Sequence, residues 1–254
     1  MIDLHSHLLP GVDDGSRSVQ QSLGVLEELQ RQGVTHLCLT PHVSASKAGD
    51  GVPEPHDRAF EALAPHVPYG IKLLRGAEVM MDKPLPAVVA DRRDLTINRT
   101  RYILIEFPRL VTAQTVAQAI AGVTGIGLIP LVAHPERYSC CTPALVGPVE
   151  SGRRRDAGGC DHALHAPHPR ERARDLVANG LADILAADNH GDERSVAIAF
   201  EALKDQHGFM QGELLVTRNP KAIISDGHVE PVPPLAVKVS LLERLRTLFE
   251  RESS

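Results

Sequence analysis

The chain begins Met1-Ile2-Asp3-Leu4-His5-Ser6-His7, a short apolar run that ends in two histidines one residue apart. Residues 18–32 follow with apolar side chains every three or four positions, and Gly33 stands where a helix commonly ends. The stretch therefore predicts a strand followed by a helix, which is the repeating unit of a parallel sheet.

The same unit recurs along the chain. Apolar, β-branched runs predict strands at residues 2–4, 36–40, 71–75, 102–107, 128–133, 183–187 and 213–217. Apolar spacing predicts helices over residues 18–32, 55–64, 112–124, 170–179 and 195–206. Strands that alternate with helices favour a mainly parallel α/β fold, either a barrel or an open sheet.

The composition is that of a globular protein. The chain has 254 residues, 43% of them hydrophobic, and a formal net charge of -5. This length fits one barrel domain over residues 1–254, and the negative charge argues against nucleic acid as a partner. No stretch approaches the ~20 apolar residues of a membrane span, so we expect a cytoplasmic protein without membrane insertion. The four cysteines form no CxxC pair and are expected as reduced thiols.

Side chains that bind metals follow the predicted strands. His5 and His7 end the first apolar run, and candidates after other runs are His42, Glu78, Glu106, His134, Asp188 and His190. The carboxyl ends of parallel strands meet at one edge, so these side chains should converge. Nitrogen and carboxylate ligands together favour zinc, manganese or iron. The pattern therefore predicts a metal centre at this edge.

Residues 139–169 break the pattern, because Gly, Pro and Arg replace the apolar runs. We expect a loop without a strand there, and the abrupt change of composition suggests the hypothesis of a frame-shifted stretch in the gene. An alternative is a separate zinc site, although the spacings match no common zinc motif. Its ligands would be Cys140, Cys141, Cys160, His162, His165 and His168.

The end of the chain predicts one more element. A Pro-rich link at 231–234 precedes a predicted helix over residues 237–251, whose leucines share one face. That apolar face would pack on the barrel or on another subunit, so a homo-oligomer is one option.

Four motifs together resemble a known family. They are Ile2-Asp3-Leu4-His5-Ser6-His7, Val12-Asp13-Asp14-Gly15, Ala133-His134-Pro135-Glu136-Arg137-Tyr138 and Ala187-Asp188-Asn189-His190. In combination they resemble the PHP-domain protein-tyrosine phosphatases, bacterial enzymes of capsular and exopolysaccharide synthesis. The resemblance covers residues 1–138 and 171–226. It implies a distorted (β/α)7 barrel, the PHP fold, disturbed around residues 139–169 where the family's strand is not recognisable.

The resemblance also implies roles for individual residues. It implies three divalent ions, with manganese expected and iron or zinc as alternatives. Their ligands would be His5, His7, Asp14, His42, Glu78, Glu106, His134, Asp188 and His190. Arg137 matches the arginine that the family places against the substrate phosphate, with a surface ion pair to Glu136 as the alternative. Arg194 is either a second phosphate contact or a solvated helix residue.

The implied reaction is hydrolysis of phosphotyrosine on a protein. By resemblance, the substrate would be the tyrosine-rich tail of a polysaccharide co-polymerase kinase, which regulates polysaccharide synthesis and export. A cysteine nucleophile is not expected, because Cys38 lies within an apolar run and Cys140 and Cys141 lack a phosphate-cradling loop. The alternatives are a PHP phosphoesterase for a small ester such as histidinol phosphate, and a non-catalytic metal-binding regulator.

Overall fold

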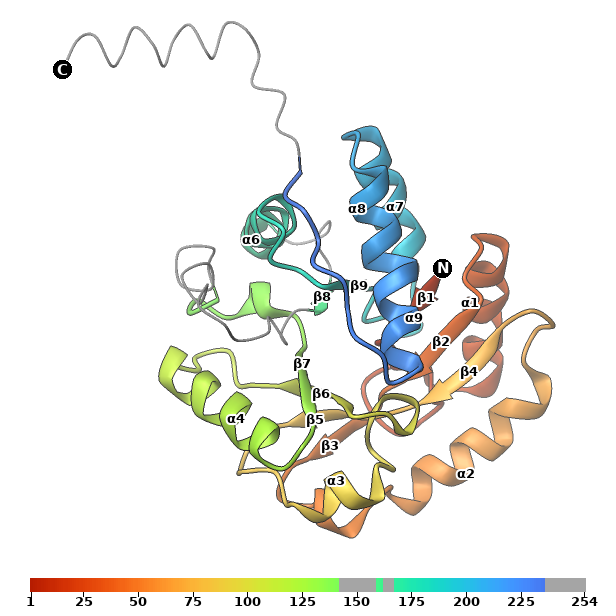
Figure 1. The fold of residues 1–254 in the computed structure, drawn as a ribbon. Coiled ribbons are helices and arrows are strands. Elements are labelled where there is room, and N and C mark those ends of the chain that lie inside the picture. The colour runs from red at the N-terminus through yellow and green to blue at the C-terminus, as the bar shows by residue number, and fades with distance from the viewer. Residues whose placement is uncertain (142–158, 162–166, 236–254) are drawn as a thin grey trace, which may run out of the picture.

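The computed structural model describes residues 1–141, 159–161 and 167–235 (Figure 1). Its strands are β1 (Ile2–Asp3), β2 (His36–Leu39), β3 (His42–Ser44), β4 (Lys72–Arg75), β5 (Glu78–Met80), β6 (Tyr102–Glu106), β7 (Ile129–Val132), β8 (Gly159–Asp161) and β9 (Ile184–Ala186). Its α-helices are α1 (Val19–Arg31), α2 (Glu54–Leu63), α3 (Val88–Arg92), α4 (Ala113–Gly125), α6 (Pro167–Ala178), α7 (Val196–Asp205), α8 (Phe209–Glu213) and α9 (Asn219–Ile224). Shorter turns are the 3₁₀ segments η1 (Ala48–Asp50), η2 (Ala64–His66), η3 (Ile97–Arg99) and η4 (Pro135–Arg137), and the π-helical segment η5 (Leu214–Arg218).

The strands form three parallel sheets. Their orders are β1-β2-β4, β3-β5-β6-β7 and β8-β9, and every paired strand runs parallel to its neighbour. A single bridge between Ser6 and Asn189 joins the segments that follow β1 and β9. In Figure 1 the helices α1, α2, α3, α4 and α6 lie around the outside of the strands. The protein therefore has the parallel α/β architecture that the sequence predicts.

Helix starts are set by local hydrogen bonds. The Ser18 hydroxyl accepts a hydrogen bond from the Gln21 amide at the start of α1, and Thr112 caps α4 in the same way. Such caps satisfy backbone N–H groups that have no partner within the first turn. After α1, Gly33 takes a φ of 88°, a left-handed conformation that glycine adopts without a steric cost.

One hydrophobic cluster joins strands from all three sheets. Ile2 of β1, Leu74 of β4, Leu104 of β6, Leu131 of β7 and Ile184 of β9 are all buried in it. Side chains alternate between the two faces of a strand, so these residues share an inner face while the helices cover the outer one. The polar residues at the carboxyl ends of the strands lie at one end of this core.

Six of the seven predicted strands are confirmed, and residues 213–217 are the exception. These residues form the end of α8 and the π-helical segment η5, which lead directly into α9. Leu214, Leu215 and Val216 are buried. A short, fully buried apolar run looks the same in a strand and in a buried helix, which explains the error.

The prediction of an uninterrupted loop over residues 139–169 is also wrong. Residues 159–161 form β8, which pairs in parallel with β9, and α6 begins at Pro167. Backbone hydrogen bonds to a neighbour can hold a strand even where the side chains give no apolar run. Cys140 and Cys141 are described with free thiols. The other proposed ligands of the separate zinc site, and the predicted tail helix 237–251, lie outside the residues whose side chains are described.

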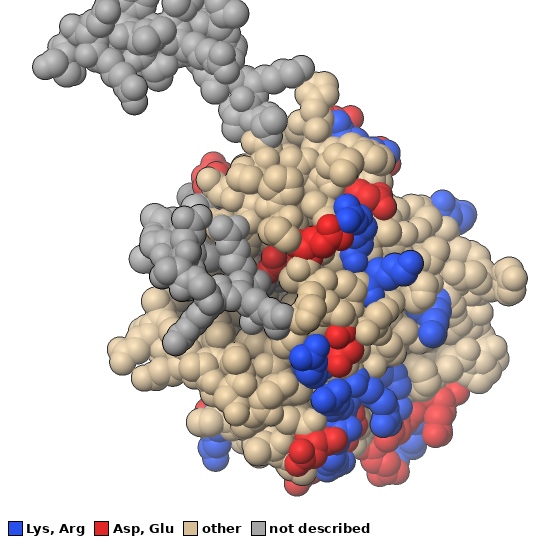
Figure 2. Space-filling model, viewed as in Figure 1, with Lys and Arg blue, Asp and Glu red and all other residues tan. Residues whose placement is uncertain are grey.

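The charged surface is mixed. Figure 2 shows Lys and Arg beside Asp and Glu in the middle and along the lower edge of the visible face. Ion pairs join Arg101 to Asp226 and Arg218 to Glu230.

Within residues 1–141, 159–161 and 167–235, no helix is both long and apolar enough to cross a bilayer.

Asn219 ties the start of α9 to two other segments. Its Nδ2 donates to the carbonyls of Asp183 at 2.8 Å and Glu230 at 2.9 Å, and its Oδ1 accepts from the Glu230 amide at 2.7 Å. The residue is fully buried. It therefore satisfies one buried carbonyl, that of Asp183, and two part-buried backbone groups of Glu230.

Asn219→Ala should lower the free energy of unfolding by about 1 to 3 kcal/mol, because it leaves the buried carbonyl of Asp183 and two part-buried backbone groups of Glu230 without this partner. Denaturant unfolding followed by circular dichroism measures this. The matched control is Asn179→Ala, which removes one exposed hydrogen bond to Asp175 and should change stability by less than about 0.5 kcal/mol. Equal effects of the two substitutions would contradict this role for Asn219.

Candidate metal centre

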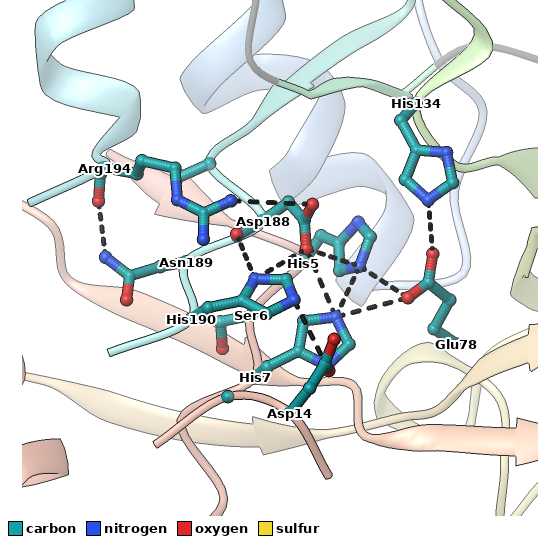
Figure 3. A network of polar contacts seen from close by, with 12 residues as sticks. His5, Ser6, His7, Asp14, Glu78, His134, Asp188, Asn189, His190 and Arg194 are labelled. Carbon is teal, nitrogen blue, oxygen red and sulfur yellow. Dashed lines mark hydrogen bonds and ion pairs between the residues drawn. The ribbon is translucent and has the colours of Figure 1, made fainter. Parts of the chain in front are cut away.

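All nine predicted ligands converge in one cluster, near the places where β1, β2, β4, β6, β7 and β9 end. His5 and His7 follow β1, His134 follows β7, and Asp188 and His190 follow β9. The others are His42 at the start of β3, Glu78 at the start of β5, Glu106 at the end of β6, and Asp14 in the turn before α1. Figure 3 labels all of these residues except His42 and Glu106, and shows the labelled side chains pointing toward one another from separate segments.

Four residues form the innermost part of the cluster. The Nε2 atoms of His5 and His7 are 3.1 Å apart. Each lies 3.2 Å from Glu78 Oε2, and Asp188 Oδ1 is 3.4 Å from His5 Nε2 and 3.2 Å from His7 Nε2. All four side chains are buried. Two imidazoles and two carboxylates therefore direct their ligand atoms at one small volume.

His42 links this inner group to the outer carboxylates. Its Nδ1 lies 3.3 Å from Glu78 Oε2 and 3.2 Å from Glu106 Oε1, while its Nε2 lies 3.3 Å from Asp14 Oδ1. His190 Nε2 is 3.6 Å from the same Asp14 oxygen. The Asp14 side chain is 71% exposed, so this side of the cluster opens to solvent.

His134 approaches from the other side. Its Nε2 lies 2.9 Å from Glu78 Oε1 and 3.5 Å from Glu106 Oε2, and its Nδ1 lies 3.1 Å from the Tyr138 hydroxyl. His134 has a φ of 33° and Asp188 a φ of 46°, so both residues adopt the left-handed conformation. Non-glycine residues in this conformation carry a conformational cost and are concentrated at functional sites.

Electrostatic compensation within the cluster shifts its pKa values. Burial alone lowers the pKa of His134, but hydrogen bonds with Glu106 and Glu78 outweigh it and raise the pKa to about 9. Burial would raise the pKa of Glu78, whereas the adjacent histidines hold it well below its usual range. The carboxylates are thus stabilised in the charged form by positive charge beside them, which is the environment that a cation would also provide.

Asp13 orients His7, a role that the sequence did not reveal. Asp13 Oδ2 lies 2.8 Å from His7 Nδ1. If Nδ1 donates this hydrogen bond, the Nε2 lone pair faces the cluster, as in metal-binding histidines. Gly15 makes the approach possible, because a Cβ at this position would lie 2.0 Å from the His7 carbonyl oxygen. The acidic turn Asp13-Asp14-Gly15 thus holds one histidine and supplies a carboxylate.

Asn189 organises the loop that carries Asp188 and His190. Its Nδ2 donates to the carbonyls of Asp192 and Arg194, and its Oδ1 accepts from the amides of Gly191 and Asp192. The Asn189 carbonyl accepts from the His7 amide at 2.7 Å. The buried side-chain amide of Asn189 therefore shapes this loop, and the backbone bond from His7 joins the loop to the segment after β1 (Figure 3).

The two predicted arginines both face Asp188. Arg137 Nη2 donates to Asp188 Oδ2 at 2.9 Å, and Arg194 Nη1 lies 3.8 Å from the same oxygen. Asp192 Oδ2 accepts from both Nε and Nη2 of Arg194 at 2.6 Å. The Arg137 and Arg194 side chains are 33% and 22% exposed, so both lie between the cluster and solvent. Asp192 is a positioning residue that the sequence did not reveal.

The donor set fits divalent transition metals. Three groups each bring their ligand atoms within 4.8 Å of one another: His7 with Asp14, His42 and His190; His5 with His7 and Asp188; and His42 with Glu78 and Glu106. Mixed imidazole and carboxylate ligands suit manganese, iron or zinc better than calcium or magnesium.

The sequence matches the family model described as "Capsular polysaccharide synthesis, CpsB/CapC" over residues 1–149. The chain belongs to the CpsB/CapC family. Two relatives in this family span nearly the whole chain. The tyrosine-protein phosphatase YwqE of Bacillus subtilis is 33% identical over 248 residues, covering 94% of this chain and 97% of that protein. The tyrosine-protein phosphatase CpsB of Streptococcus pneumoniae is 27% identical over 249 residues, covering 89% and 99%.

Solved structures show the same fold as this CpsB/CapC protein. A crystal structure from the pair YwqE and CpsB, described as unique metal-dependent tyrosine phosphatases, superposes with a TM-score of 0.74 at 24% identity. It covers 94% of this chain and all of that one. The phosphotriesterase of Mycobacterium tuberculosis superposes less closely, with a TM-score of 0.52 at 12% identity over 90% of this chain.

Proposed function

We propose that this CpsB/CapC protein is a metal-dependent phosphatase that hydrolyses phosphotyrosine on a protein. The observation that carries the proposal is the convergence of nine histidine and carboxylate side chains beside two arginines at one edge of the sheets. The curated relatives are tyrosine-protein phosphatases, which supports this activity over hydrolysis of histidinol phosphate and over a non-catalytic role. The substrate would be a tyrosine kinase of polysaccharide synthesis, in keeping with the family's link to capsules.

The proposal assigns three divalent ions to the three groups of ligand atoms, with manganese as the expected metal. His7 and His42 each belong to two of these groups, so the ligand atoms of the three groups lie close together. His134 would complete the ligand set beside Glu78 and Glu106. When bound, such ions supply Lewis acidity that lowers the pKa of a water molecule and neutralises the charge of a phosphate.

The protein's own residues orient the substrate. The planar guanidinium of Arg137 can give two parallel hydrogen bonds to phosphate oxygens once it leaves Asp188 Oδ2. Asp192 holds Arg194 by two of its nitrogens, so that Nη1 remains directed toward the cluster. Asp13 keeps the His7 ring in place. These contacts hold the arginines and His7 in place, so that a phosphate would be bound beside the metal ligands before any bond is broken.

We further propose that residues 1–254 form one domain whose sheets make a distorted (β/α)7 barrel. Strand β3 would continue β2 at one position of the barrel, and β5 would continue β4 at another. The nine strands that the structure describes would then occupy seven positions. The bridge between Ser6 and Asn189 and the hydrophobic cluster common to the three sheets support this arrangement.

Activity should survive thiol alkylation but disappear on treatment with a chelator. Burial raises the pKa of Cys38 well above its usual range and that of Cys141 to about 12, so neither forms a thiolate at neutral pH. Turnover of a phosphotyrosine peptide after iodoacetamide, with metal content measured in the same sample, tests this. The control Cys140→Ser removes the half-buried thiol. Loss of turnover in step with alkylation, at unchanged metal content, would count against the proposal.

A further inference from the structure

Three exposed basic residues lie at equivalent positions beyond three neighbouring strands. In the register of the sheet β3-β5-β6, Ser44 pairs with Met80, and Met80 pairs with Glu106. The residues three positions beyond these are Lys47, Lys83 and Arg109, and all three are exposed. We call them the basic rim.

Hydrogen bonds hold the three segments side by side. The amide and hydroxyl of Ser46 donate to Asp82 at 3.0 and 2.6 Å, which joins the segment after β3 to the segment after β5. The Met81 amide donates to the Glu106 carbonyl at 2.9 Å, which joins the latter to β6. Adjacent strands lie about 4.8 Å apart, so the rim spans on the order of 10 Å where it leaves the sheet.

The same three strands carry part of the candidate metal centre. Lys47 follows His42 by five residues, Lys83 follows Glu78 by five, and Arg109 follows Glu106 by three. All three rim residues therefore lie on the carboxyl side of residues in the metal-ligand cluster. Because the rim lies three to five residues beyond His42, Glu78 and Glu106, residues that flank a phosphotyrosine bound in the cluster could reach it.

The rim has unbalanced positive charge. None of its three side chains makes a hydrogen bond or ion pair with the residues that the structure describes. Residues 45–47, 81–84 and 107–110 contain one acidic side chain, Asp82, whose pKa is lowered by the two hydrogen bonds that it accepts from Ser46 and also by the charge of Lys83. Three basic residues and one acidic residue leave these segments with a net charge of +2. Leu110, beside Arg109, is 92% exposed and adds an apolar contact surface. The positive charge of the rim contrasts with the net charge of -5 of the whole chain, and it would attract an anionic peptide.

We propose that the basic rim binds acidic residues that flank the phosphotyrosine of a peptide substrate. The inference rests on the proposed phosphatase function and adds a substrate preference to it. Because the rim residues are exposed, each contributes a modest, salt-sensitive attraction that acts mainly on substrate binding. It should therefore appear in KM rather than in kcat.

The test is charge reversal of the whole rim, with Lys47→Glu, Lys83→Glu and Arg109→Glu combined. Three substrates are compared: a phosphotyrosine peptide flanked by glutamates, the same peptide with glutamines, and the small ester p-nitrophenyl phosphate. The matched control carries Arg31→Glu, Lys72→Glu and Lys221→Glu, which reverse three exposed charges elsewhere. Single rim variants give a second readout if the triple variant is unstable.

For the rim variant we expect kcat/KM on the glutamate peptide to fall about tenfold at low salt, through KM, and the loss to shrink at ~0.5 M salt. The glutamine peptide and the small ester should change by less than about twofold, as should every substrate with the control. An equal loss of kcat/KM on both peptides, or no loss on either, would overturn the proposed binding of acidic residues by the basic rim. So would rim-dependent binding to phosphatidylserine vesicles with unchanged peptide kinetics. Wild-type protein that cleaves the small ester but neither peptide would also overturn the proposed hydrolysis of phosphotyrosine on a protein and would favour a small-ester phosphoesterase.

Discussion

A double substitution His5→Ala and His7→Ala should remove the bound metal and lower kcat/KM on a phosphotyrosine peptide by about a thousandfold or more. Both Nε2 atoms lie within 3.4 Å of Glu78 and Asp188, so the substitution removes two ligands and leaves two buried carboxylates without their histidines. Elemental analysis and turnover, measured on the same sample, test the expectation.

The matched control for this variant is His36→Ala combined with His66→Ala. These histidines lie in β2 and η2, away from the cluster, and neither is among the candidate ligands. The control should keep its metal and its activity. Full activity in the His5 and His7 variant would exclude these residues as ligands, and metal loss in the control would show that any pair of histidine substitutions disturbs the fold.

Arg137→Lys should keep the metal but lower kcat/KM about ten- to a hundredfold. Lysine retains the positive charge but not the planar fork, so the loss of a two-point phosphate contact costs about 1.5 to 3 kcal/mol. The present contact of Arg137 is a single 2.9 Å hydrogen bond to Asp188, so metal content is measured beside turnover to detect a displaced ligand.

Two further variants are compared with Arg137→Lys. Arg218→Lys changes an exposed arginine that pairs with Glu230 and should leave turnover unchanged. Arg194→Lys reports on the second arginine, which Asp192 holds near the same carboxylate. If Arg137→Lys had no effect on turnover while Arg194→Lys reduced it, Arg194 would replace Arg137 as the main phosphate contact.

The edge that carries the candidate site could be predicted from the sequence because its residues follow apolar runs. Parallel strands place their carboxyl ends together whatever the exact sheet geometry, so His5, Glu106 and His134 could be assigned to one place. The structure adds that His42 and Glu78 begin strands of their own, which at three residues each are too short to show a recognisable pattern. The ends of β2 and β4 therefore continue into a second sheet.

Other features depend on interactions that residue type alone does not specify. Asp13 acts through a hydrogen bond to His7, and Asn189 acts through backbone groups of its own loop. The basic rim depends on the register between three strands, which fixes Lys47, Lys83 and Arg109 at equivalent positions. Strand β8 likewise depends on pairing with β9, because its own residues show no apolar alternation.

The most direct test of a metal-dependent phosphotyrosine phosphatase is the metal content of purified protein, measured beside turnover of one phosphotyrosine peptide. We expect about three transition-metal ions per chain, since three groups of ligand atoms are present. Removal of the metal by a chelator should abolish turnover, and added Mn²⁺ should restore it. Undiminished hydrolysis of the peptide by metal-free protein would contradict the account.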